Sequence, residues 1–458
     1  MSDSLSLSGR LEASLDVGPA IVEWSAVSGT PLAAEVERAR ASGNSGLARC
    51  CAVRHSIPVP AAFSEMGEPL PMLLTSRRSQ VAASLALIAT FGGVSLVLGS
   101  RVMPGTIPER ISDETFWKMV SEYSEPGGFF RSDNFVSNEI TFQWVLPELA
   151  KTTKSGGVYL GVGPDQNFTY IVGMQPKIAF IVDIRRQNML HHLLYKSLIE
   201  LSPDRAEFLS RLFSRPKPVG LEPNAGAAAL FQAYANVAPD SALFQKNLAA
   251  VKDQLVSRHK FGLTGDDLRT IEYVYTAFYS AGPDLTYSFT MPGRGGTMMF
   301  YGRRMPTYAE LMMESDGNGA QRSYLANEEN YRWLRDLERN NLLVPLVGDF
   351  AGDKAIKSVG QFVRDNGATV TAFYTSNVEQ YLFQSDDWKK FFTNVSTLPL
   401  DSSSTFIRAV FNFTNTSASP SGTPGPRSRT MLAGIKDQVQ AFSDGKLQTY
   451  WDVITTSR

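Results

Sequence analysis

Cysteine and histidine are scarce in this sequence, and their positions limit its chemistry. The 458 residues include two cysteines, Cys50 and Cys51, and four histidines. The chain after Cys51 therefore has no thiol for a disulfide, a metal site or a nucleophile. No two histidines have the i, i+4 spacing that places both side chains on one helix face for a metal. We expect thiol-free chemistry and no metal ion in the C-terminal part of the chain.

An excess of either charge is also missing. Lys and Arg number 44 and Asp and Glu 45, so no overall field attracts nucleic acid, and we expect no nucleic-acid partner. The glycine-rich stretch 293–296 lacks the Lys-Ser/Thr of a phosphate loop, and no Gly-x-Ser-x-Gly motif of serine hydrolases occurs after residue 113. A content of 43% hydrophobic residues is sufficient for a globular core.

Residues 1–75 show no sustained helical or strand period. They are rich in Ser, Ala, Gly and Pro, so the sequence predicts a weakly structured extension. Met66 and Met72 lie close to the apolar segment that follows. We interpret one of them as the true start and the residues before it as a gene-model extension, because a signal-like segment belongs at an N-terminus.

Residues 79–100 carry no charge and are long enough to cross a bilayer as a helix. Arg77 and Arg78 precede them, and by the positive-inside rule this end stays in the cytoplasm. The segment is predicted to be a transmembrane helix or a signal peptide that places the C-terminal domain in the cell envelope, either anchored or exported. A buried core helix is the alternative.

From residue 113 the pattern is that of an α/β domain, extending to residue 458, with a mostly parallel sheet and flanking helices. A largely helical insertion is predicted at about 202–340. The unbroken apolar run 179–182 is typical of a parallel strand that is covered on both faces. The predicted strands are 158–162, 177–183, 342–347, 369–374 and 406–411, the predicted helices outside the insertion are 113–123, 187–201, 353–364 and 430–442, and a β-hairpin is predicted around 293–296.

The clearest motif is the strand beginning at Val158, which ends in Gly161-Val162-Gly163 and turns into a short helix. Glycines at such a turn let the backbone approach a ligand, and the helix N-terminus, at Gln166 and Asn167, offers free N–H groups. Asp183 closes the next strand, where a carboxylate can accept hydrogen bonds from two ribose hydroxyls. These residues predict a small-molecule site for a nucleoside-containing cofactor.

In these residues the sequence resembles the class I S-adenosylmethionine-dependent methyltransferases, which have a Rossmann-like fold. Gly161 and Gly163 match the first two glycines of the family's cofactor loop. The resemblance implies that Asp183 holds the ribose, that Asp349 lies at the adenine side, and that the cofactor is S-adenosylmethionine. The chain differs from the family at Asp165, where a third glycine is usual, at Tyr159, where an acid is usual, and in having Thr-Ser-Asn-Val at 375–378 in place of the Asn/Asp-Pro-Pro-aromatic motif. The whole chain is also similar to an uncharacterised group of bacterial proteins with this core.

Asp165 bears on which ligand fits the loop. A carboxylate at a helix entrance repels a pyrophosphate and can pair with an ammonium or a sulfonium, which favours S-adenosylmethionine over a dinucleotide. The alternative is that Asp165 caps the short helix.

The segment 125–139, upstream of the first strand, is dense in turn-forming and polar residues. Arg131 could hold a carboxylate of the ligand, and Asn138 or Glu139 a polar edge. Turn and cap formation is the alternative for Asn138 and its neighbours.

Two functions remain open. One is a methyltransferase whose catalytic residues are unknown. The other is a non-catalytic, envelope-located ligand-binding domain, which the predicted export favours because S-adenosylmethionine is a cytoplasmic metabolite. For Asp183 we expect a functional role, and the alternative is a strand anchor satisfied by N–H groups or by Arg185. The oligomeric state does not follow from the sequence.

Overall fold

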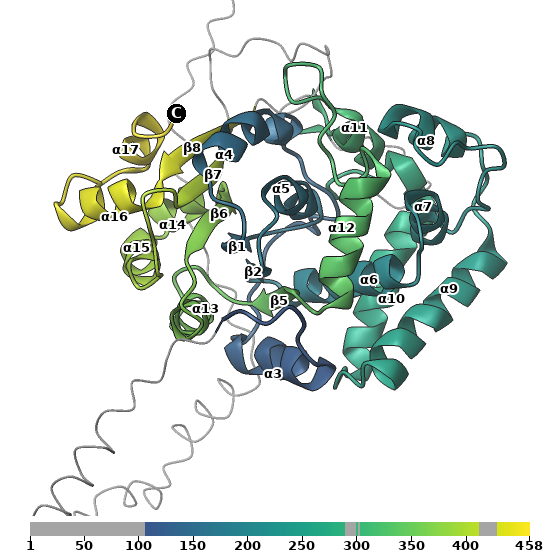
Figure 1. Ribbon diagram of the computed structural model, residues 1–458, viewed down its shortest axis with the longest axis horizontal. Coiled ribbons are helices and arrows are strands. Elements are labelled where there is room, and N and C mark those ends of the chain that lie inside the picture. Colours follow the sequence, from purple (N-terminus) through teal and green to yellow (C-terminus); the bar gives the residue numbers. More distant parts are fainter. Residues whose placement is uncertain (1–105, 289–298, 301–302, 412–427) are drawn as a thin grey trace, which may run out of the picture. The chain divides into compact units, whose positions relative to one another are not determined.

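The computed structural model describes residues 106–288, 299–300, 303–411 and 428–458. Within these ranges the chain forms a six-stranded sheet with helices on both sides (Figure 1). The predicted mixed α/β fold with a mostly parallel sheet is thereby confirmed. Over the same ranges, no helix has both the length and the apolar character needed to cross a membrane. The predicted extension 1–75 and the apolar segment 79–100 lie outside the described residues.

The order in which the chain adds strands to the sheet reverses at the central strand β1. Its strand order is β5-β2-β1-β6-β7-β8, and all neighbours are parallel except β7 and β8. The chain adds β2 and β5 on one side of β1 and then returns to add β6 on the other side. Ligands bind at such a reversal in open α/β sheets, outside the carboxyl ends of the strands. The strands are β1 (Val158–Gly161), β2 (Ile178–Asp183), β5 (Leu343–Val347), β6 (Val370–Ser376), β7 (Thr405–Phe411) and β8 (Ser428–Gly434).

The helix predicted over residues 430–442 is wrong in its first half. Residues 428–434 form β8, and helix α16 begins only at Ile435. The strand pairs antiparallel with β7 along its whole length, from Ser428 opposite Phe411 to Gly434 opposite Thr405. The apolar run 431–433 fits a helix or a strand equally well, and this long-range pairing decides between them.

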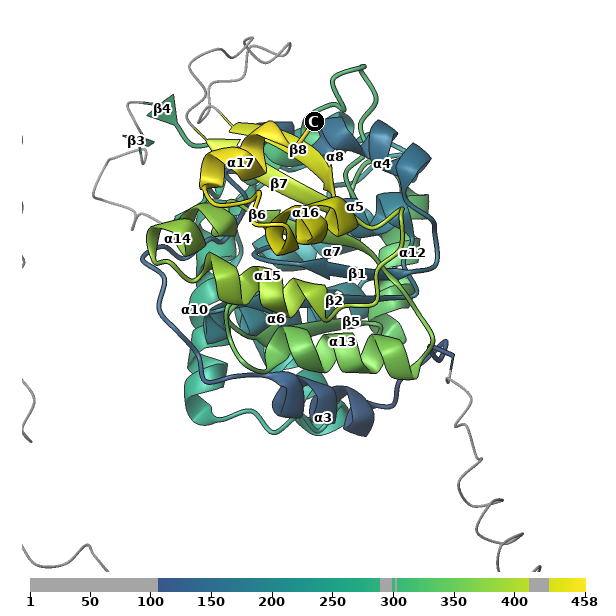
Figure 2. The ribbon, with the colours of Figure 1, turned by 90° about the vertical axis from the view of Figure 1, so that its left-hand side faces the viewer.

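Helices cover both faces of the sheet (Figures 1 and 2). Helices α13 to α17 lie on one side, whereas α5, α6 and α12 (Glu328–Arg339) lie on the other. Helix α3 packs against the edge strand β5. The helices outside the insertion are α3 (Asp113–Tyr123), η1 (Ile140–Val145), α4 (Leu146–Thr152), α5 (Gln166–Met174), α6 (Arg186–Glu200), α13 (Ala355–Asp365), α14 (Val378–Gln384), α15 (Trp388–Ser396), α16 (Ile435–Ser443) and α17 (Tyr450–Thr455).

The segment between α6 and β5 is mostly helical in its described residues. It contains α7 (Arg205–Phe213), α8 (Ala227–Tyr234), α9 (Ser241–Asp253), η2 (Gln254–Arg258), α10 (Gly265–Ala281), η3 (Gly282–Asp284), α11 (Tyr308–Met313) and α12 (Glu328–Arg339), with the short strands β3 (Met299–Phe300) and β4 (Arg303–Arg304). The predicted glycine turn at 293–296 lies outside the described residues.

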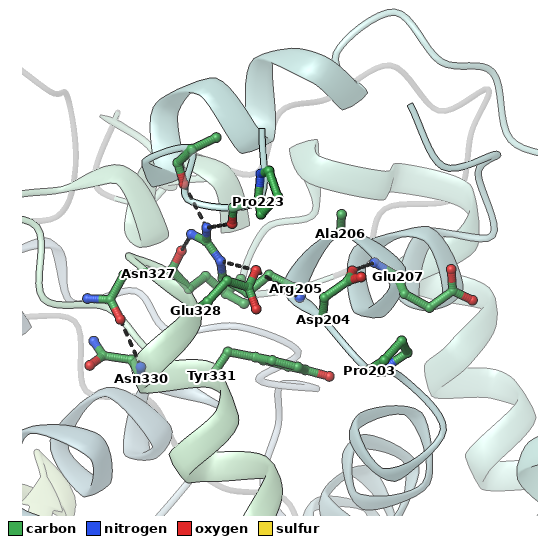
Figure 3. Close-up of polar contacts among 12 residues, drawn as sticks. Pro203, Asp204, Arg205, Ala206, Glu207, Pro223, Asn327, Glu328, Asn330 and Tyr331 are labelled. Atoms are coloured by element: carbon green, nitrogen blue, oxygen red, sulfur yellow. Dashed lines mark hydrogen bonds and ion pairs between the residues drawn. The ribbon is translucent and has the colours of Figure 1, made fainter. Parts of the chain in front are cut away.

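One buried arginine ties this segment together. Arg205 is 1% exposed and its guanidinium bonds to Glu328 Oε1 at 2.8 Å (Figure 3). The same group donates to the carbonyl oxygens of Leu325, Pro223 and Ala225. These bonds join the start of α7, the loop before α8 and the start of α12. Arg205 thus joins three carbonyl groups of these loops to the carboxylate of Glu328 through charge-assisted hydrogen bonds.

Candidate functional site

A cavity of about 510 Å³ lies at the carboxyl edge of the sheet. Residues that directly follow β1, β2 and β5 form part of its wall: Gly163, Pro164, Ile184, Arg185, Gly348 and Asp349. Residues that follow β6 complete this wall, so the cavity sits where the strand order reverses. We refer to it below as the edge cavity. Its volume is in the range of cavities that hold small molecules and cofactors.

The structure brings six of the ten predicted site residues into the wall of this cavity. These are Asn138, Glu139, Gly163, Gln166, Asp183 and Asp349, whereas Arg131, Gly161, Asp165 and Asn167 are not part of it.

Gly163 forms the turn between β1 and α5. Its φ is +78°, a left-handed value that favours glycine, and a Cβ built there meets no atom within 4 Å. His192 Nε2 lies 2.9 Å from the Gly163 carbonyl oxygen and donates a hydrogen bond to it. Burial lowers the pKa of His192 to about 4, so the ring is neutral at pH 7. A neutral, buried histidine therefore fixes the backbone of this turn through its hydrogen bond to the Gly163 carbonyl oxygen.

Asn167 fastens the other side of the same turn. Its Nδ2 donates to the carbonyl oxygens of Val162 at 2.9 Å and Pro164 at 2.7 Å, and its Oδ1 accepts from the Tyr159 hydroxyl at 2.8 Å. A Cβ on Gly161 would lie 1.9 Å from that Oδ1. Gly161 consequently makes room for Asn167 and does not approach a ligand.

Asp165 faces away from the edge cavity, into the protein. It occupies the N-cap position of α5, but its side chain makes no capping hydrogen bond. The hydroxyl of Tyr324 donates to its Oδ2 at 3.2 Å. Burial raises the pKa of Asp165 to about 7. The side chain of Asp165 therefore neither lines the cavity, where it could pair with a ligand, nor caps α5.

Glu139 is the most enclosed carboxylate of the wall, with 1% of its surface exposed. Gln166 Nε2 donates to Oε2 at 2.7 Å, while Tyr374 at 2.7 Å and Ser376 at 2.5 Å donate to Oε1. Burial raises its pKa, and these three hydrogen bonds oppose that effect. Glu139 thus links the segment before β1 to α5 and β6.

Asp183 lies at the end of β2 and forms a buried ion pair with Arg185. Arg185 Nη2 lies 2.8 Å from Asp183 Oδ2, and Nε donates to Oδ1 at 3.0 Å. Nη1 donates to the carbonyl oxygens of Ser132 and Asp133. Asp183 therefore both lines the cavity and anchors the segment 125–139 through Arg185, while Arg131 in that segment is exposed.

Asp349 follows β5 and is also bound to this segment. Its backbone N–H donates to Glu125 Oε2 at 3.0 Å, and its Oδ1 accepts from the N–H of Ala351. Glu125 also accepts hydrogen bonds from the N–H groups of Lys354 and Ala355, at the start of α13. The segment thus crosses the ends of β2 and β5 and closes the cavity on this side.

The sequence did not reveal an aromatic part of the wall. Phe130 and Tyr381 contact edge to face, with ring centroids 5.5 Å apart, and Tyr287 also lines the cavity. Phe129 lines it with 87% of its surface exposed. Such rings are suited to packing against a flat heterocycle. These residues come from three separate segments, so no local pattern groups them.

Ser376 has an unusual backbone for a residue of its type. Its φ is +52°, it is the last residue of β6, and its hydroxyl donates a hydrogen bond to Glu139. Residues other than glycine rarely adopt left-handed conformations, and the examples that exist are concentrated at functional sites.

Acidic side chains dominate the charge of the cavity wall. Four carboxylates line it, those of Glu139, Asp183, Asp349 and Asp387, against the single guanidinium of Arg185. With all of them ionised the lining side chains carry three net negative charges, and Lys390, which pairs with Asp387 from outside the wall, reduces this to two. This balance favours a ligand that carries positive charge. Across the described ranges, no group of three or more His, Cys, Asp and Glu residues is arranged to hold a metal ion.

Residues 134–428 match the family described as a domain of unknown function, DUF7790. The match covers more than half of the sequence. The chain belongs to this family. Its matched region begins just before Glu139 and includes all strands of the sheet except most of β8, so the edge cavity is built almost wholly within the family domain. No curated protein matches the sequence.

Proposed function

We propose that this domain binds S-adenosylmethionine in the edge cavity and is a methyltransferase-like protein. The observation that carries the proposal is the convergence of Gly163, Asp183 and Asp349 on one cavity. These residues follow or end three different strands, and they lie where the strand order reverses. This arrangement supports a nucleotide site of the Rossmann-like kind.

The wall offers a suitable contact for each part of this cofactor. The aromatic pair of Phe130 and Tyr381 can pack against adenine. Asp183 already accepts three hydrogen bonds from Arg185, and because an ionised carboxylate has about four acceptor sites, one remains on Oδ2 for a ribose hydroxyl. The acidic balance of the wall suits the sulfonium and ammonium groups.

A non-catalytic ligand-binding domain is the second candidate. The buried pair of Asp183 and Arg185 favours it, because this pair fastens the segment 125–139 and gives the carboxylate a structural role. The predicted membrane or signal segment 79–100 is part of this proposal, since it places the domain in the cell envelope.

Thermal unfolding of the full chain with S-adenosylmethionine and S-adenosylhomocysteine tests the proposal. A ligand that binds only the folded state raises the melting temperature, and at 100 times its dissociation constant it contributes about 2.7 kcal/mol. Tyr381→Ala, which removes one ring of the aromatic pair, should reduce the shift. Trp451→Ala, the same kind of change at a 63% exposed aromatic residue outside the cavity, should not. No shift at millimolar ligand with folded protein would refute the proposal.

A further inference from the structure

Glu139 has no cationic partner in the part of the chain that the structure describes. Three neutral groups bond to it, from Gln166, Tyr374 and Ser376, and no Lys, Arg or His of the described residues forms an ion pair with it. A buried carboxylate without a counter-charge is costly. The three donors offset part of this cost because they stabilise the ionised form.

The other carboxylates of the edge cavity are in a different situation. Asp183 is neutralised by Arg185 at 2.8 Å, and Asp387 by Lys390 at 2.8 Å. Asp349 is only half-buried and accepts a backbone hydrogen bond. Glu139 is therefore the carboxylate of this wall that combines near-complete burial with an uncompensated charge.

The neighbours of Glu139 do not titrate near neutral pH. The ionisable groups that face it are the hydroxyls of Tyr159 on β1, Tyr170 on α5 and Tyr374 on β6. Burial raises the pKa of each hydroxyl well above its usual range, so all three stay protonated. Among these four side chains, the charge that changes as the pH rises from acid values is thus that of Glu139.

We propose that Glu139 is the counter-charge for a cationic centre of the bound ligand, an ammonium or a sulfonium group. The identity of the ligand rests on the proposed function above. The claim about Glu139 adds which residue meets the positive charge and at which place in the cavity. The ligand's cation then lies against the carboxylate, between the start of α5 and the end of β6.

Calorimetric titration of the full chain with three adenosyl compounds tests this assignment. S-adenosylmethionine carries a sulfonium and an ammonium, S-adenosylhomocysteine only the ammonium, and 5′-methylthioadenosine neither. We expect Glu139→Gln to weaken binding of the charged compounds by about 10- to 100-fold and to leave the uncharged one nearly unchanged. A loss shared by the first two indicates the ammonium, and a loss confined to the first indicates the sulfonium. Glu122→Gln, the same change at an exposed residue of α3, should have no effect.

The pH profile separates a charge contact from a structural role. Binding of S-adenosylmethionine to the wild type should strengthen as the pH rises and Glu139 ionises, and the Glu139→Gln profile should lack this increase. The difference between the two profiles isolates Glu139, because Asp165 titrates in both proteins. Ser376→Ala keeps the carboxylate but removes one donor, which raises the pKa of Glu139, so the midpoint of the profile should move to higher pH. This variant also serves if Glu139→Gln does not fold.

Three results would overturn the assignment. The first is equal affinity of wild type and Glu139→Gln for S-adenosylmethionine, which would leave the proposed function intact. The second is an equal loss for all three compounds, including 5′-methylthioadenosine. The third is that the wild type binds none of the three, which would overturn the proposed function together with the assignment.

Discussion

Replacing Asp165 by asparagine tests how the buried carboxylate beside the glycine turn affects stability. Asp165 is 1% exposed, and burial raises its pKa from about 4 in an unfolded chain to about 7. The folded protein therefore binds this proton more tightly than the unfolded chain does. Below pH 4 both states carry the proton, and the stabilisation is fully present.

Between pH 4 and 7 the unfolded chain releases the proton while the folded protein keeps it, so stability falls as the pH rises. Above pH 7 both states are ionised and the loss levels off. A difference of about three pKa units corresponds to about 4 kcal/mol, of which about 2.5 kcal/mol falls between pH 5 and 8. The asparagine of the variant has no proton to lose, and its amide oxygen can still accept the hydrogen bond from Tyr324.

Urea unfolding of wild type and Asp165→Asn at pH 5, 6.5 and 8 measures this difference. Groups that titrate in both proteins, such as His192 and Glu338, cancel in the comparison. We expect the variant to gain stability over the wild type as the pH rises, by about 2.5 kcal/mol across this range. Asp353→Asn, at a carboxylate that is fully solvated, should show no such trend. A difference that does not vary with pH would refute the reasoning.

Three further outcomes follow from the contacts described above. Arg205→Met should lower the free energy of unfolding by about 3–5 kcal/mol in urea, because it leaves Glu328 buried without a partner, and adding Glu328→Gln should recover part of the loss; a change below about 1 kcal/mol would contradict this. Asp183→Ala should cost the ligand-free protein about 3–5 kcal/mol through the unpaired Arg185, and an unchanged melting curve would show that the ion pair is not an anchor. A topology reporter fused after residue 112 should be active outside the cytoplasm, and activity only inside it would remove the proposed export.

Local sequence patterns predicted the parts of the site that each lie on one strand and its following loop. The apolar runs 158–160 and 179–182 marked β1 and β2, so the positions of Gly163 and Asp183 followed directly. Parallel strands place their carboxyl ends on one edge, which is why Asp349 joins them. These predictions needed no knowledge of contacts between distant residues.

Contacts between distant residues decided the rest of the site. Glu139 meets Tyr374 and Ser376 across 235 and 237 residues of sequence, and no local pattern shows that this carboxylate lacks a cation. Arg131 was predicted to reach the ligand, yet Arg131 is exposed and its neighbour Phe130 lines the cavity, since adjacent residues of the segment point in different directions.

Two sequence features had structural reasons that the motif alone did not supply. Tyr159 stands where an acid is usual, and its hydroxyl bonds to Asn167, which holds the turn. Asp165 stands in place of a glycine and faces Tyr324 in the segment between α6 and β5. Both residues are buried beneath the turn and do not line the cavity. The partner of Tyr159 is Asn167 on the far side of the turn, and the partner of Asp165, Tyr324, is distant in sequence, so the motif alone shows neither contact.

Hydrogen–deuterium exchange of the full chain, with and without S-adenosylmethionine, tests the central claim that the edge cavity is the ligand site. The account predicts slower exchange in the turn 162–167 and in the segment 125–139, since both form the wall of the cavity. Helices α8 and α9, which are not part of that wall, should exchange at the same rate in both conditions. Protection confined to α8 and α9, or no protection with saturating ligand, would contradict the account.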